Sequence, residues 1–334
     1  MDNYLDSPIF ICGHRKGGTT MLINMLDNAK DAIVYPDDSS FFYLYYPRFE
    51  SSQYTNREKI SRIKDIIIDE VLYDIINDLN IDEKDKQELL VKKHEFGNNV
   101  IDDLKTCDFI NSKNILLTII KNLQNTFYKN NTPKVWIEKT TSTEIYALDL
   151  IKLFPNAKFV HVIRDPRDNW ASLNSGWDQR YSKMNDDKQR VLHSMFERAK
   201  LGLEFAKNNQ TILGKDKYHI IKYEDLTTQP EYYMKIIADF IGIDFNQNLL
   251  IPTTFGYSWQ GNNFEGVKFK KASNKNVGRW KERIPKEEAM LIEYHFKDIM
   301  DHFGYERCYN LLETVNMAKE HYKWSNFSTP YSAK

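Results

Sequence analysis

The sequence has little cysteine and no long apolar run, and both shortages narrow what the chain can be. Its three cysteines, Cys12, Cys107 and Cys308, are odd in number and far apart. They indicate neither a disulfide framework nor a zinc site, and they are typical of a reducing compartment. No stretch approaches about 18 uncharged apolar residues, so we expect no membrane span.

An excess of charge of one sign is lacking as well. The 334 residues include 46 Lys and Arg against 47 Asp and Glu, a net charge of −1. A protein that coats nucleic acid would be basic, so we expect no nucleic-acid partner, although a local basic pocket stays open. The first residues, Met1 to Asp6, are polar and acidic and show no secretory signal. We therefore expect a cytoplasmic protein; whether it was trimmed from a longer, anchored chain stays open.

A glycine-rich, basic segment follows the first apolar run. Residues 9–12 are typical of a buried strand, residues 13–18 of a turn, and the apolar spacing from Met21 to Leu26 of a helix. Such a turn points backbone N–H groups and the positive end of the helix at one spot, where a phosphate or sulfate binds. Gly17 and Gly18 let the backbone close around an anion, and Lys16 adds a positive charge.

The turn is close to a Walker A loop, with one departure. Gly13 and Gly18 have the G-x-x-x-x-G spacing, but Thr19 stands where an NTPase needs lysine, and the lysine lies inside the loop at Lys16. The residue that bridges β- and γ-phosphates is therefore missing. Taken alone, an ordinary strand-to-helix connection explains such a turn equally well.

Two acids follow the second predicted strand. Residues 33–35 are typical of a strand that ends at Pro36, and Asp37 and Asp38 come next. Open α/β sheets bind ligands where strands end, but an acid at this place also caps the next helix. Without further observations, capping is the better interpretation.

Residues from about 50 to 130 differ in amino-acid composition from the rest of the chain. The segment is charged, rich in Asn, Asp, Lys and Ile, and almost free of glycine. Two apolar faces recur with helical spacing: Ile63, Ile66, Ile67, Val71 and Leu72, and then Ile115, Leu116, Ile119, Ile120 and Leu123. We interpret the segment as a helical insertion that covers one end of the sheet and whose apolar stripes belong to the core.

Three further strands complete the predicted sheet, at residues 134–139, 158–163 and 218–222. The second is a near-continuous apolar run, which suits a central parallel strand, and His161 inside it is expected to be a core histidine. The sequence thus predicts one α/β domain over residues 1–334, with a P-loop-type, mainly parallel central sheet flanked by helices.

Five segments, in order, resemble those of the sulfotransferases that use 3′-phosphoadenosine 5′-phosphosulfate (PAPS). Residues 13–20, GHRKGGTT, resemble the 5′-phosphosulfate loop, in a style close to the heparan sulfate (Golgi-type) and bacterial members. Residues 163–172, IRDPRDNWAS, resemble the 3′-phosphate motif. Residues 136–140 (WIEKT), 223–226 (YEDL) and 278–280 (GRW) resemble three further motifs, whereas residues 50–130 match none.

The resemblance implies transfer of a sulfuryl group from PAPS to a hydroxyl or amine acceptor by in-line displacement, with no metal required. It implies these PAPS-binding residues: Arg15, Lys16, Gly17, Gly18, Thr19, Thr20, Arg164, Ser172, Tyr223, Arg279 and Trp280. Lys16 is also the expected catalytic cation, because it would neutralise charge on the departing phosphate. Arg164 and Ser172 would bind the 3′-phosphate that ATP lacks.

The motifs identify the general base, which would deprotonate the acceptor, less clearly than the PAPS-binding residues. In many Golgi-type relatives an acid follows the loop by about twenty residues and precedes paired aromatics, and Asp38 before Phe41 and Phe42 resembles that pattern. Asp37 and Glu138 are the competing acids, and His14 and His161 match no motif position of the family. We expect Asp38 to be the base.

Two other functions stay open. A P-loop kinase of small molecules would depend on Mg²⁺, and Thr19 argues against it. A protein that binds PAPS or its product PAP without catalysis would have no need of Lys16 and Asp38. The sequence specifies neither the oligomeric state nor whether the acceptor is a glycan, a lipid, a tyrosine or a small molecule.

Overall fold

A parallel sheet forms the centre of the first of two units into which the chain divides. The computed structural model describes residues 3–176, 187–261, 266–269 and 271–324. Unit 1 comprises residues 1–163, 206–261 and 267–273, and unit 2 comprises residues 164–205, 262–266 and 274–334. Within the described ranges, no helix is long and apolar enough to cross a membrane.

The five strands of the sheet all run parallel, in the order β2-β3-β1-β4-β5. Their bounds are β1 Pro8–Cys12, β2 Ala32–Val34, β3 Val135–Lys139, β4 Lys158–Ile163 and β5 Tyr218–Lys222. Every residue of β1 is buried, as expected of a strand with a neighbour on each side and helices on both faces. The predicted α/β fold with a mainly parallel sheet is confirmed.

The strand order places a reversal of direction beside β1. After β1 the chain moves to β2 at one edge of the sheet, whereas after β4, on the other side of β1, it moves to β5 at the opposite edge. Connections that diverge in this way leave a crevice at the carboxyl ends of the strands, where open α/β sheets bind ligands. The glycine-rich loop that follows β1 begins at this point.

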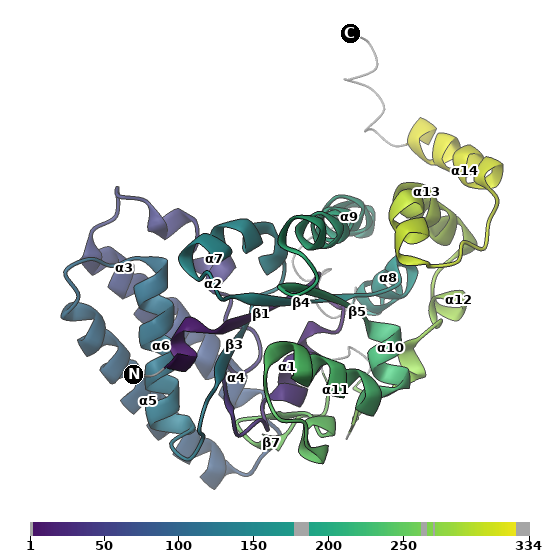
Figure 1. Cartoon of the computed structure of the whole chain (residues 1–334). Helices are drawn as coiled ribbons and strands as arrows, with labels where there is room; N and C mark the ends of the chain where they lie inside the picture. Colours follow the sequence, from purple (N-terminus) through teal and green to yellow (C-terminus); the bar gives the residue numbers. More distant parts are fainter. Residues whose placement is uncertain (1–2, 177–186, 262–265, 270, 325–334) are drawn as a thin grey trace. The chain divides into compact units, whose positions relative to one another are not determined.

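Helices cover both faces of the sheet (Figure 1). Helices α1 (Thr19–Leu26) and α11 (Pro230–Ile241) lie on one face, and α2 (Phe41–Leu44) and α7 (Ala147–Leu153) lie on the other. The remaining elements of unit 1 outside the insertion are η1 Asn3–Asp6, η4 Thr143–Tyr146, α10 Tyr223–Thr228, η7 Gln247–Leu250, and a two-stranded hairpin of β6 Thr253–Thr254 and β7 Tyr257–Ser258.

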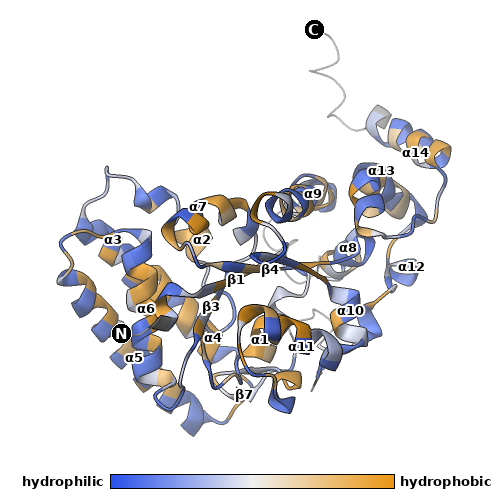
Figure 2. Ribbon diagram, in the orientation of Figure 1, coloured by the Kyte–Doolittle hydropathy of each residue, from blue (hydrophilic) through white to orange (hydrophobic). Residues whose placement is uncertain are grey.

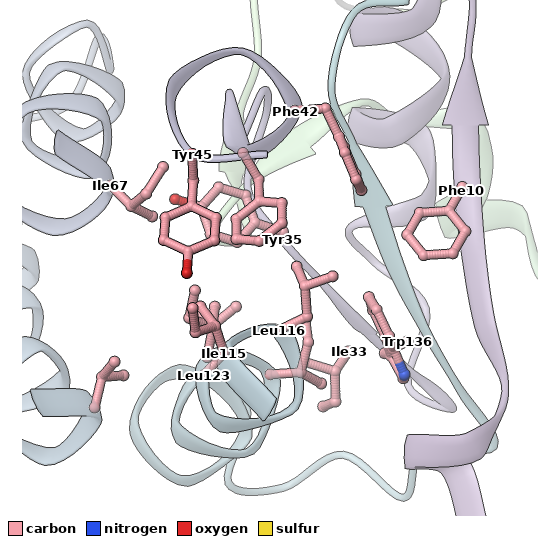
Figure 3. Close-up of a cluster of buried hydrophobic side chains, with 14 of the residues drawn as sticks. Phe10, Ile33, Tyr35, Phe42, Tyr45, Ile67, Ile115, Leu116, Leu123 and Trp136 are labelled. Carbon is pink, nitrogen blue, oxygen red and sulfur yellow. The ribbon is translucent and has the colours of Figure 1, made fainter. Parts of the chain in front are cut away.

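The predicted insertion is helical. It contains η2 Arg48–Glu50, α3 Asn56–Arg62, the π-helix η3 Ile63–Val71, α4 Leu72–Asn77, α5 Glu83–Lys105 and α6 Ser112–Phe127. Helix α5 is hydrophilic along most of its length (Figure 2). On the other helices most residues of the predicted apolar faces, among them Ile67, Ile115 and Leu123, are buried, and Ile66 and Val71 are half-buried. They pack with Phe10, Tyr35 and Trp136 in one hydrophobic cluster (Figure 3).

Unit 2 is largely helical. Its elements are α8 Pro166–Asn174, η8 Asn274–Asn276, α12 Trp280–Arg283, α13 Lys286–Phe303 and α14 Leu311–Trp324, and α9 Lys188–Leu213 contributes to both units. Helix α14 was not predicted, and residues 223–226 form the first turn of a helix, α10, where no helix was expected. Short or strongly charged helices carry a weak apolar period, so packing decides them more than pattern does.

Candidate active site

The loop between β1 and α1 has a backbone that only glycine can form at two positions. Gly13 has φ 139°, and a Cβ added there would lie 2.5 Å from the Val162 carbonyl oxygen. Gly18 has φ 105°, and its Cβ would lie 2.4 Å from a ring carbon of Tyr223. Both contacts are far inside van der Waals distance, so the two glycines are required by close packing of β4 and Tyr223 against the loop.

At the end of this loop, no capping side chain accepts a hydrogen bond from the first N–H groups of α1. Gly18 is the N-cap of α1 and has no side chain that could accept a hydrogen bond from the first turn. The positive end of α1 and its N–H groups therefore suit an anion. Lys16 lies in this loop with φ 60°, a left-handed conformation that is unfavourable for lysine.

Backbone strain gathers at the carboxyl ends of β1, β2 and β3. Among the described residues, five that are not glycine have positive φ, and four of them follow these strands: Lys16 (60°), Asp37 (55°), Ser40 (54°) and Ser142 (67°). Such conformations persist where the surrounding structure enforces them, and they concentrate at functional sites.

Asp37 and Asp38 share a buried lysine that the sequence analysis did not single out. Lys139, at the end of β3, has a side chain only 3% exposed. Its Nζ donates to Asp38 Oδ2 at 2.8 Å and to Thr20 Oγ1 at 3.1 Å, and lies 3.9 Å from Asp37 Oδ1. Thr20 therefore joins the phosphate-type loop to the acid pair through Lys139. The visible signal was the lysine at a strand end, inside WIEKT.

The two acids differ in how firmly they are held. Asp38 accepts hydrogen bonds from Ser40 N at 2.9 Å and Thr141 Oγ1 at 3.0 Å in addition to Lys139. Burial raises its pKa, but Lys139 and these donors outweigh burial and hold the pKa below its usual value. Asp37 receives one long bond, 3.4 Å from Thr20 Oγ1. Burial raises the pKa of Asp37, which Lys139 offsets only in part.

Glu138 lies within the protein interior. Successive residues of a strand point to opposite faces, so Glu138 and Lys139 leave β3 on different sides. Its Oε1 accepts from Ser39 Oγ and, at 2.7 Å, from Thr140 Oγ1. Burial is the main cause that raises the pKa of Glu138 to about 7.

Two more buried titratable groups adjoin the end of β1. Glu144 accepts the Gly13 N–H at 3.0 Å, and burial raises the pKa of this carboxyl to about 7. No sequence motif indicates this contact. His161 pairs through Nδ1 with Tyr218 Oη at 2.7 Å, and burial lowers the pKa of its imidazole to about 3. His161 is a core residue, as expected.

The second predicted anion site belongs to unit 2. Arg164 directly follows β4, and its Nη2 donates to the Asn276 carbonyl at 3.0 Å. Arg279 Nη1 donates to Asn276 Oδ1 at 3.1 Å, so both arginines meet at the same residue. Ser172 lies on α8 and is partly exposed.

Asp168 holds the GRW segment. Its Oδ2 accepts the Gly278 N–H at 2.6 Å and its Oδ1 accepts the Trp280 N–H at 2.8 Å. Asp168 also lies in the first turn of α8, and its bonds to the GRW segment could not be seen in the sequence. Arg167 lies over the Trp280 ring at 4.3 Å and pairs with Asp165 and Glu293 at 2.7 and 2.6 Å.

The structure thus brings the predicted residues together in two sets. Unit 1 holds Arg15, Lys16, Gly17, Gly18, Thr19, Thr20, Asp37, Asp38 and Tyr223, and unit 2 holds Arg164, Ser172, Arg279 and Trp280.

Comparisons with known proteins agree on one family. The family model described as "Sulfotransferase family" matches residues 8–247. Protein-tyrosine sulfotransferase of Drosophila melanogaster is 29% identical over 101 residues, which are 30% of this chain and 19% of that protein. The chain therefore matches less than a quarter of the length of this curated relative.

Two solved structures are similar over most of the chain. The sulfotransferase domain from the curacin biosynthetic pathway has a TM-score of 0.58 at 16% identity, covering 89% of this chain and 97% of that domain. The sulfotransferase domain of the Synechococcus PCC 7002 olefin synthase has a TM-score of 0.56 at 18% identity, covering 90% and 95%. At these identities the likeness concerns the fold.

Proposed function

The chain belongs to the sulfotransferase family, and on that premise we propose that it transfers a sulfuryl group from PAPS to a hydroxyl or amine acceptor. The observation that carries the proposal is the loop of residues 13–18, whose Gly13 and Gly18 leave no room for a Cβ and whose end opens on the first turn of α1. A cradle of this kind fits a phosphosulfate. PAPS supplies an activated sulfuryl group on a phosphate leaving group.

The residues of the loop have distinct parts in this proposal. The N–H groups at the start of α1 bind the 5′ anion, and Thr19 and Thr20 add hydroxyl donors. Lys16 places a full positive charge in the loop, where it stabilises negative charge that develops on the leaving phosphate. Arg15, Gly17 and Tyr223, whose ring packs on Gly18, complete this part of the site.

Arg164 and Ser172 are proposed to bind the 3′-phosphate. A guanidinium matches phosphate with two parallel hydrogen bonds. The contact of Arg164 with Asn276, and the bonds from Asp168 to Gly278 and Trp280, support a role for Arg279 and Trp280 beside it.

The contacts favour Asp37 over Asp38 as the general base, the reverse of the order expected from the motif. A base works best when its pKa approaches the operating pH, and burial raises the pKa of Asp37 while Lys139 and its other donors lower that of Asp38. In this assignment Asp38 holds Lys139, which orients Thr20 and Asp37. Glu138, buried beneath Ser39, stays the third candidate.

Other parts of the proposal rest on the sequence. They are a single domain over residues 1–334 with the helical insertion over the acceptor site, activity without a metal ion, and a cytoplasmic location that fits the cysteine content. The class of the acceptor is left unspecified.

Calorimetric titration with PAP and with ATP, both without magnesium, tests the proposal. We expect PAP to bind more tightly than ATP and Arg164→Ala to weaken PAP binding about 10- to 100-fold, the worth of a charged hydrogen-bonded pair. Arg198→Ala, an exposed arginine of the same unit, is the matched control. Equal affinity for both nucleotides, with no effect of Arg164→Ala, would contradict the proposal and favour the kinase alternative.

A further inference from the structure

A cavity of about 480 Å³ lies in unit 1, at the opposite end of α1 from the glycine-rich loop. Residues 27–30, which follow α1, form one wall; α5, the end of α6 and the turn of the β6–β7 hairpin form the others. The eight residues of α1 separate the cavity from the loop by about 12 Å, at roughly 1.5 Å per residue. The cavity is therefore distinct from the proposed PAPS loop.

The charge of the lining is unbalanced. Three lysines, Lys30, Lys92 and Lys129, line the cavity, and no hydrogen bond or ion pair joins the ammonium group of any of them to another described residue. Asp27 is the only acid among the described residues of the lining. Both of its oxygens are occupied, Oδ1 by Tyr128 Oη at 2.9 Å and Oδ2 by Thr253 Oγ1 at 2.7 Å and Gly256 N at 2.8 Å. Burial also raises the pKa of Asp27, which favours its neutral form.

The hairpin turn presents an aromatic ring at a strained position. Phe255 and Gly256 connect β6 and β7 with φ 54° and 77°, the pattern of a type I′ turn. Asn-Gly and Asp-Gly are the favoured sequences of this turn, because a bulky residue with positive φ is strained. Phe255 nevertheless occupies the first position, and its ring lies 4.6 Å from that of Phe127, centroid to centroid.

Asp27 enforces this strained turn. The N–H groups of Phe255 and Gly256 both hydrogen-bond to its carboxylate, which is anchored at the end of α1. Strain that the surroundings impose in this way is a mark of a functional position.

A buried donor completes the lining. Thr126, near the end of α6, is 4% exposed, and its hydroxyl has no hydrogen-bond partner within the ranges that the structure describes. Buried hydroxyls in folded proteins are almost always paired, so this one is available to a bound molecule. The cavity combines surplus cations, an unused hydroxyl and an aromatic pair.

We propose that this cavity is a second binding site, which takes a small organic anion with a planar ring. The ring stacks beside Phe127 and Phe255, and the anionic group lies among Lys30, Lys92 and Lys129. The volume lies within the usual range for small-molecule sites. The proposal does not depend on the reaction assigned to the loop.

Titration of the full chain with phenyl phosphate, followed by methyl NMR, tests the site. We expect the Leu89 methyl signals, which report on the cavity wall, to shift with phenyl phosphate but not with methyl phosphate or benzyl alcohol, which lack the ring or the charge. The Met21 methyl signal, beside the loop, reports separately on binding there.

Two kinds of variant separate the charge from the ring. Lys92→Gln is expected to weaken binding about 2- to 5-fold, the range of an exposed ion pair, whereas Lys215→Gln, an exposed lysine outside the cavity, leaves it unchanged. Phe255→Asn supplies the favoured turn sequence without the ring, so binding is expected to fall at least 5-fold while the unfolding temperature does not. Phe255→Tyr keeps the ring and retains binding.

Three results would overturn the proposal. They are shifts at Met21 without shifts at Leu89, equal binding of methyl phosphate, and unchanged affinity in both Lys92→Gln and Phe255→Asn. Because Lys92 lies on the surface and outside the turn, its variant keeps the test valid even if the Phe255 variants do not fold.

Discussion

Within the loop, Gly18 is the position at which an added Cβ would make the shortest contact. A Cβ there would meet the Tyr223 ring at 2.4 Å, and φ is 105°. We expect Gly18→Ala to abolish PAP binding and to destabilise the fold by about 1–3 kcal/mol, the range for strained backbone and overpacking. Calorimetry and thermal unfolding measure the two effects.

Gly242 supplies the control, because it has φ 85° and nothing within 4 Å of an added Cβ. Gly242→Ala should show the conformational strain alone and leave PAP binding intact. A second change, Tyr223→Ala, removes the clash and should restore part of the stability of Gly18→Ala. If Gly18→Ala behaves like Gly242→Ala, Tyr223 does not restrict the loop.

The two candidate bases, Asp37 and Asp38, predict opposite shifts of the acid limb of the pH–rate profile. If Asp37 is the base, Asp37→Asn lowers turnover about 10²- to 10⁴-fold. The acid limb of the kcat/KM profile should then lie above the ordinary carboxyl pKa, because burial raises the pKa of Asp37. If Asp38 is the base, the limb lies below that value, because its pKa is lowered. A pH–rate profile with Asp37→Asn and Asp38→Asn decides between them, and an undiminished rate in Asp37→Asn sinks the preferred assignment.

The raised pKa of Glu138 leads us to expect that the stability of the fold depends on pH. Burial raises its pKa from 4.5 to about 7, so across this window the folded state holds a proton that the unfolded chain has released. The free energy of unfolding therefore falls as pH rises through the window, by up to about 3 kcal/mol from this group. Glu138→Gln should be more stable than the parent at pH 8 but not at pH 5, measured by denaturant unfolding. Glu95→Gln, an exposed change, should show no such difference.

At the scale of elements, α8 and the GRW segment depend on one carboxylate. Asp168 accepts the N–H groups of Gly278 and Trp280. Asp168→Asn keeps one acceptor and loses the charge, so we expect faster hydrogen exchange at these two amides. Since hydrogen bonds to charged groups are worth about 1.5–3 kcal/mol, we also expect a loss of PAP affinity of at most about 10- to 100-fold. Ser175→Ala, at the C-cap of α8, is the control. Unchanged exchange at Gly278 would mean that the segment is held by other contacts.

Elements with a clear period or a close motif could be predicted from the sequence. The apolar runs of β1 and β4 predict buried strands, and the faces from Ile63 to Leu72 and from Ile115 to Leu123 predict helices that pack inward. The π-helical form of η3 could not be predicted, because an apolar period does not distinguish i→i+5 from i→i+4 hydrogen bonds.

The candidate site could be predicted only where its residues follow one another. Gly13 to Thr20 form one loop, so spacing alone indicates an anion site. Lys139 and Glu144 lie more than 100 positions along the chain from their partners, Asp38 and Gly13. Nothing in the local sequence pattern indicates these contacts. Their part in the site depends on the pairing of β3 with β1, which sets long-range contacts that a motif does not contain.

At the scale of the whole molecule, the predicted PAPS-binding residues belong to two different units. Two ligands that differ in the 3′-phosphate can therefore test the two sets separately. PAP at about 100 times its Kd should stabilise the protein by about 2.7 kcal/mol and slow hydrogen exchange both in residues 13–22 and in α8. Adenosine 5′-phosphosulfate, which lacks the 3′-phosphate, should protect the loop and leave α8 unchanged. Protection of α8 by both ligands would contradict the assignment of Arg164 and Ser172.

The central position of β1 also bears on how the chain is made. This strand is complete at Cys12, but its neighbours begin at Val135 and Lys158. At about 5–20 residues per second, a ribosome needs on the order of ten seconds to deliver the first of them. During that time a wholly apolar strand has left the exit tunnel without a partner, and unpaired strands of this kind associate with other chains. A ribosome that stalls before Lys139 would release a chain whose first strand cannot be buried, so demand for chaperones should be greatest early in synthesis.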